Sequence, residues 1–174
     1  YLQIDKFLSP KLFNLAKEFF GFRGKLSNQY HIARKVLPGN IKEQFRAHFD
    51  SHIFTMVLPI KIPTSSSGQS TGDLIYFSNI RDMPNNEISN LFGKVYYKKF
   101  ASSNGIKKLI KNKNSVTENF INYEPLIFLG KTTLHANYPV ADDCSSYRLT
   151  LLAHFFDDSS KFSSGNVLRF LRNR

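Results

Sequence analysis

The chain has 174 residues, of which 41% are apolar, and its 24 Lys and Arg against 13 Asp and Glu give a formal net charge of +11. This length fits one domain over residues 1–174, and no apolar run approaches the roughly 20 residues that cross a bilayer, so we expect no transmembrane helix and no membrane partner. The single cysteine, Cys144, excludes an internal disulfide and fits a reducing, cytoplasmic location. The charge suits an anionic partner, or else only a solvated basic surface.

Residues 6–22 carry apolar side chains at helical spacing. Ser9 is a suitable N-cap with Pro10 at the first helical position, and Gly21 is a suitable stop. We therefore predict one amphipathic helix that packs against a sheet. Between this helix and residue 44, we predict only a short strand within residues 30–39.

Four later segments have strand composition, and turn signals separate them. They are residues 52–62, 74–79, 124–140 and 147–157, with a Ser/Gly-rich turn at residues 63–73. One leading helix followed by many short strands predicts a mainly β (α+β) fold, a two-sheet sandwich of jelly-roll type with helical additions.

Residues 88–117 differ from the rest of the chain because they contain seven lysines and no acidic residue. We predict a basic, helical insertion here, within residues 78–123, that forms a lid over the strands. The alternative is a solvated excursion with no role in function.

His48 and Asp50 stand two residues apart at the start of the first long apolar run. On an extended backbone, residues i and i+2 project from the same face, so an imidazole and a carboxylate there can converge on one metal ion. With five histidines in the chain, such a pair is weak evidence by itself. A further histidine, His135, stands at the end of another strand-like run, before Asn137 and Pro139.

Arg148 and Thr150 share one face of the last predicted strand. A guanidinium on the inner face of a β fold is costly unless an anion meets it, and an arginine beside a hydroxyl is a suitable receptor for a carboxylate. The alternative is an ordinary ion pair with Asp142 or Asp143 in the preceding loop.

In this chain order the features resemble the iron(II)/2-oxoglutarate-dependent dioxygenase family, in particular its small prolyl-hydroxylase-like members. The resemblance is carried by His48, Asp50 and the segments 71–77, 134–140 and 148–150. It implies a double-stranded β-helix, a cupin-like jelly roll, in which two histidines and one carboxylate bind Fe(II). The three ligands would be His48, Asp50 and His135.

The resemblance also implies 2-oxoglutarate as co-substrate and O2 as oxidant. Arg148, assisted by Thr150, would hold the distal carboxylate of 2-oxoglutarate, and Tyr30 and Thr55 are candidates for a second contact. The implied reaction hydroxylates a protein side chain, a peptide or a small metabolite, while 2-oxoglutarate is decarboxylated to succinate. Because Asp50 keeps the carboxylate, hydroxylation or a related oxidation is favoured over halogenation.

Two other functions stay open. The basic charge favours oxidative demethylation of a nucleic acid, but the second arginine that this branch carries soon after the first is missing after Arg148. A jelly-roll binding module without catalysis is the third possibility. Among the other histidines, His154 is expected in the core or near the site rather than as a ligand. His52 is interpreted as an ordinary residue, with lining the cavity as the alternative, and His31 has no predicted partner.

Overall fold

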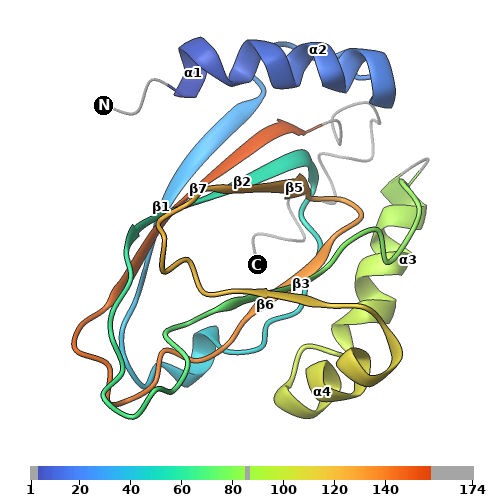
Figure 1. The fold of residues 1–174 in the computed structure, drawn as a ribbon. Coiled ribbons are helices and arrows are strands. Elements are labelled where there is room, and N and C mark those ends of the chain that lie inside the picture. The colour runs from blue at the N-terminus through green and yellow to red at the C-terminus, as the bar shows by residue number, and fades with distance from the viewer. Residues whose placement is uncertain (1–3, 85–86, 158–174) are drawn as a thin grey trace.

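The structure is a computed structural model and describes residues 4–84 and 87–157. Two antiparallel sheets lie face to face, with helices against their outer surfaces (Figure 1). This arrangement confirms the prediction of a mainly β chain with a leading helix. The site described below lies between the two sheets.

The larger sheet has the strand order β1-β7-β2-β5, and the smaller one has the order β4-β3-β6. Every neighbouring pair is antiparallel. The larger sheet consists of β1 (Gln29–Val36), β2 (His52–Lys61), β5 (Leu126–Leu129) and β7 (Arg148–Asp157). The smaller sheet consists of β3 (Leu74–Phe77), β4 (Val116–Glu118) and β6 (Leu134–Asn137). The predicted strand over 124–140 is two strands, because the chain turns at residues 130–133.

The alternation of side chains across each strand separates an inner face from an outer one. On β6, His135 and Asn137 line an inner cavity, while Leu134 and Ala136 pack on the outer side. Between the sheets, bordering this cavity, an apolar cluster includes Val57, Leu74, Phe120 and Phe128. This cluster holds the two sheets together.

The N-terminal helices α1 (Ile4–Phe7) and α2 (Ser9–Phe20) lie across the outer face of the larger sheet (Figure 1). α2 buries Leu12 and Ala16 against side chains of β2 and β7, and it ends at Gly21, which has the left-handed conformation predicted for a helix stop. The prediction of Ser9 as the N-cap is wrong. Ser9 is the first helical residue, and its buried hydroxyl donates a hydrogen bond to Gln29 Oε1 in β1.

The lysine-rich segment forms two helices, α3 (Glu87–Lys98) and α4 (Ser103–Asn112), before β4. The Ser102 side chain caps α4 by accepting from the Gly105 amide. α4 buries Ile106 and Leu109 against the outer face of the smaller sheet. A short 3-10 helix, η1 (Ile41–Glu43), lies between β1 and β2. None of the helices within the described residues is long and apolar enough to cross a bilayer.

Candidate metal centre

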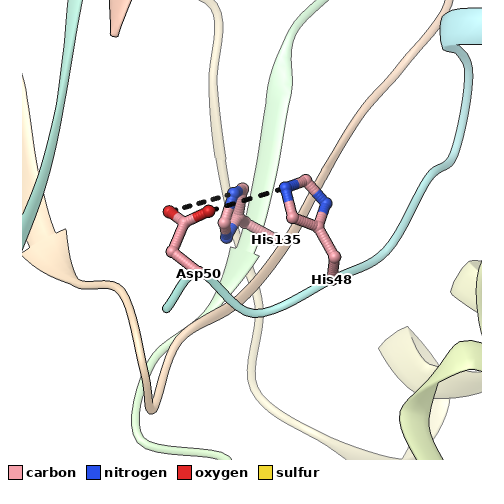
Figure 2. Close-up of side chains that lie close together, drawn as sticks. All are labelled: His48, Asp50 and His135. Atoms are coloured by element: carbon pink, nitrogen blue, oxygen red, sulfur yellow. Dashed lines mark ion pairs between the residues drawn. The ribbon is translucent and has the colours of Figure 1, made fainter. Parts of the chain in front are cut away.

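His48, Asp50 and His135 meet at one point, although 85 residues of sequence separate the last two (Figure 2). His48 and Asp50 lie in the segment just before β2, and His135 lies in β6. Two backbone hydrogen bonds join His48 to His135, 3.0 and 3.1 Å long, in an isolated β-bridge. This bridge brings two imidazoles to the same place, with ring centroids 4.3 Å apart.

Both imidazoles present Nε2 to the carboxylate of Asp50. His48 Nε2 lies 3.7 Å from Oδ1, and His135 Nε2 lies 3.7 Å from Oδ2 (Figure 2). On the other side of each ring, Nδ1 contacts a backbone carbonyl, that of Arg46 at 2.6 Å and that of Thr133 at 3.3 Å. A carbonyl accepts only from N–H, so Nδ1 carries a proton, and in the neutral ring Nε2 then keeps its lone pair for a metal ion.

Asp50 is held from behind by β2 and the turn before β6. Its Oδ2 accepts a hydrogen bond of 2.6 Å from the Thr55 hydroxyl, and its amide donates to the carbonyl of Gly130. Burial alone would raise the pKa of Asp50, but the imidazoles of His135, His48 and His154 and the Thr55 hydroxyl together lower it to about 2. The carboxylate is therefore ionised at neutral pH, as a metal ligand must be.

His135 is also in the protonation state that a metal ligand needs. Burial lowers the pKa of His135 to about 4, and the neighbouring His48 acts in the same direction, against the opposing effect of Asp50. The ring is neutral at pH 7, so its Nε2 lone pair is available. His48 differs in exposure, since about half of its side chain (51%) faces solvent, against 9% for His135 and 10% for Asp50. The centre is thus closed on two sides and open at His48.

The three side chains form one wall of an inner cavity of about 240 Å³ between the sheets. Alternate residues of β7 form another wall, with Arg148, Thr150 and His154 pointing inward as their common parity predicts. β1 pairs with β7 in this register, so Tyr30 stands opposite His154 and Arg34 opposite Thr150.

Arg148 is a buried cation in this cavity, 5% exposed, and its Nε is a buried nitrogen without a hydrogen-bond partner among the described residues. Burial lowers the pKa of Arg148 to about 10, so the guanidinium is still charged at neutral pH. Its charged group lies 5.4 Å from the Phe120 ring. A Cβ on Gly72 would come 3.1 Å from Nη1, so this glycine makes room for the guanidinium. A buried guanidinium with an unsatisfied nitrogen is suited to receive an anion.

The alternative pairing of Arg148 with the adjoining loop finds no support among the described contacts. Asp143 instead accepts hydrogen bonds from the side chains of Ser65, Ser66 and Ser67. The carboxylate whose charge acts on Arg148 is that of Asp73.

Tyr30 and Thr55 both line the inner cavity, but in different roles. The ring of Tyr30 stacks on His154, with centroids 4.8 Å apart. The Thr55 hydroxyl is engaged by Asp50, so its first contact is with the candidate ligand rather than with a co-substrate. His154 lies 3.3 Å from that hydroxyl through Nδ1, which agrees with a place near the site but not at the metal.

Sequence reasoning missed several parts of the centre. Gly130 has no motif around it, yet an added Cβ there would lie 2.8 Å from Thr55 Oγ1 and 2.9 Å from Asp50 Cβ. The carbonyls of Arg46 and Thr133 belong to the backbone and leave no trace in residue type. A partial signal existed for Arg34, which has the inward parity of β1 and donates to Asn137 and Glu43.

The donor set of two imidazoles and one carboxylate could hold a metal ion, since its ligand atoms lie within 4.8 Å of one another. Nitrogen and oxygen donors on one side of a metal, with the other positions open, are typical of non-haem Fe(II) sites. Within the described residues, no other group of three or more His, Cys, Asp or Glu side chains has this closeness.

No family model and no curated protein matches the chain. Among solved structures, it is similar to the Kdo hydroxylase KdoO, a non-heme Fe(II) α-ketoglutarate-dependent dioxygenase, in a complex with succinate and Fe(III) (16% identity, TM-score 0.39). The apo structure of the same hydroxylase gives 15% identity and a TM-score of 0.41. Both likenesses cover 95% of this chain and 67% of the other.

Proposed function

We propose that this chain is an Fe(II)- and 2-oxoglutarate-dependent oxygenase that hydroxylates its substrate while 2-oxoglutarate is decarboxylated to succinate. The observation that supports it is a juxtaposition within one cavity. A two-histidine, one-carboxylate group and a buried arginine with an unsatisfied Nε line the same 240 Å³ space. A metal ligand set alone would fit many functions, but the added anion receptor favours this one.

His48, Asp50 and His135 would hold the iron, and bound Fe(II) would supply the activation of O2 that the oxidation needs. The chain's own residues hold the three ligands in the tautomer or orientation that metal binding needs. The Arg46 and Thr133 carbonyls keep Nδ1 protonated in the two histidines, and Thr55 orients the carboxylate. Asp50 and His135 do not have to change their protonation state before a metal binds at neutral pH.

Arg148 and Thr150 would bind the distal carboxylate of 2-oxoglutarate. The Arg148 guanidinium provides positively charged hydrogen-bond donors for a carboxylate, and the Thr150 hydroxyl lies on the same inner face of β7. The Phe120 ring packs against the guanidinium, and Gly72 lacks a side chain that would displace it. Because the guanidinium is buried, water competes only weakly with the co-substrate for it. The same proposal has four further parts. They are the jelly-roll form of the double-stranded β-helix, a single domain over 1–174, a lid over 78–123 and a cytoplasmic location.

The test is iron and 2-oxoglutarate binding without oxygen, followed by succinate formation in air. We expect a visible charge-transfer band only when both Fe(II) and 2-oxoglutarate are present, and succinate release that depends on both. Asp50→Ala should abolish iron binding, and Arg148→Leu should leave iron bound but weaken 2-oxoglutarate. His31→Gln is the control, because it removes a histidine from the exposed face of β1. An unchanged Asp50→Ala variant would contradict the proposal.

A further inference from the structure

A second, larger depression lies outside the inner cavity. It has a volume of about 820 Å³ and is bounded by β1, the 40–49 segment and α3. We call it the outer groove. It shares wall residues with the inner cavity, namely Arg34, Asn40, Glu43, His48, Asn137 and Leu152. The exposed side of His48 therefore faces the groove, which is where a substrate would approach the candidate metal centre.

The groove wall is strongly basic. Lys35 comes from β1, Arg46 from the segment before His48, and Lys94 and Lys98 from α3. Glu43 is the acidic residue in the lining, and both Arg34 and Arg46 pair with it. Since its charge is already compensated, the groove presents a net positive field to a molecule that enters.

Between these charges the groove has apolar surface. Ile32 and Val95 are 45% and 62% exposed on its two sides, and Phe49 and Leu152 contribute to its base. A concave site with apolar walls and a few charged groups suits a small organic molecule, and the volume of the groove is in the usual range for such sites. The lysines of α4, by contrast, are not part of the lining.

We propose that the outer groove binds the substrate, and that this substrate is a small molecule with an apolar body and an anionic group, a phosphate or a carboxylate. The anionic group contacts Arg46, Lys94 and Lys98, and the apolar body lies between Ile32 and Val95 with its oxidised carbon toward His48. The assignment as a substrate groove rests on the oxygenase function proposed above. Binding of an anion there does not.

The test uses NMR titration of the metal-free protein with phenyl phosphate, benzoate and benzyl alcohol, and it needs neither iron nor turnover. We expect the two anions to bind about tenfold more tightly than the alcohol, with shifts at the amides of residues 46–49 and 94–98. Lys94→Gln/Lys98→Gln should weaken the anions about fivefold. Lys107→Gln/Lys108→Gln on α4 removes the same charge outside the groove and should change affinity less than about twofold.

Because Lys94 donates to Ser51, Arg46→Gln provides an independent variant that should also weaken the anions. Equal affinity for benzyl alcohol, an equal loss in the α4 variant, or loss of binding in Arg148→Leu would overturn the proposal. The last result would place the anion in the inner cavity. Anion binding in the groove by a protein that never forms succinate would overturn the substrate assignment. Succinate formation without anion preference would overturn the groove alone.

Discussion

Thr55 is the side chain through which β2 orients the candidate carboxylate. Its hydroxyl donates to Asp50 Oδ2 at 2.6 Å and contributes to the low pKa of Asp50. We expect Thr55→Val to weaken metal binding about 10- to 100-fold, because the carboxylate loses its fixed orientation. Anaerobic Fe(II) titration measures this loss.

Thr150→Val is the matched control for this prediction. It removes a hydroxyl from the same cavity, but Thr150 makes no contact with Asp50 among the described hydrogen bonds. We expect unchanged iron affinity and weaker 2-oxoglutarate binding. Equal loss of iron binding in both variants would mean that the cavity as a whole, rather than the Thr55 hydroxyl, determines metal affinity.

Gly130 leaves the space in which Asp50 and Thr55 meet. A methyl group there would lie 2.8 Å from Thr55 Oγ1 and from the His52 carbonyl, and one of these neighbours is backbone that cannot move easily. We therefore expect Gly130→Ala to lower the free energy of unfolding by about 1–3 kcal/mol and to weaken iron binding. Gly68→Ala is the comparison, since that position has open space and only the strain of a positive φ. It should lose some stability and no iron affinity.

The residues that sequence reasoning could name are those whose side-chain chemistry is unusual for their place. The spacing of His48 and Asp50 and the inward parity of Arg148 and Thr150 follow from the two-residue period of extended chain, and the structure brings these side chains to one cavity. Gly130 could not be predicted from the sequence, because it contributes by having no side chain where Asp50 and Thr55 meet. The choice of His135 over His154 as the third ligand depended on the resemblance, since both histidines end up within 4 Å of Asp50.

At the level of whole elements, α2 supports the sheet from outside while the candidate centre lies on the other side. Leu12 is 6% exposed in the contact with β2 and β7. We expect Leu12→Ala to lower the free energy of unfolding by about 2–5 kcal/mol and to leave iron affinity unchanged in the folded protein. Leu15→Ala on the same helix, 41% exposed, should cost less than about 1 kcal/mol. Chemical denaturation of both variants with parallel iron titrations checks this.

The elements themselves were largely readable from the sequence because each carries local signals. The long apolar runs predicted the bounds of β2 and β7 to within a residue or two, and Gly21 predicted the end of α2. The N-cap was misplaced because Ser9 is used by β1, a contact across 20 residues that no local pattern contains. The turn within 124–140 was missed for a similar reason, since Gly130 reads as a strand glycine until its partner Ile53 is known.

The whole molecule should lose stability as the pH falls, because it buries histidines in their neutral form. Burial lowers the pKa of His52 and of His135 to about 4 from 6.5, and it also lowers the pKa of His154. An unfolded chain binds protons at His52 and His135 below pH 6.5, whereas the folded chain binds them there only near pH 4. The stabilisation is therefore complete above pH 6.5 and is lost between pH 6.5 and 4.

We expect the free energy of unfolding in urea, with EDTA present to remove metal, to be constant above about pH 7 and to fall by up to about 1.4 kcal/mol per pH unit for each such histidine below it. Asp50 adds a further loss of stability below its ordinary pKa of 3.8, because its folded pKa of about 2 keeps it ionised after the unfolded carboxyl is protonated.

His52→Asn removes one buried histidine that is not a candidate ligand, so the slope of its unfolding free energy against pH should be shallower by about one proton. A slope that is flat between pH 7 and 5, or unchanged in this variant, would mean that water reaches these rings. With Fe(II) added and EDTA left out, the slope should be steeper, because protons then compete with the metal for His135.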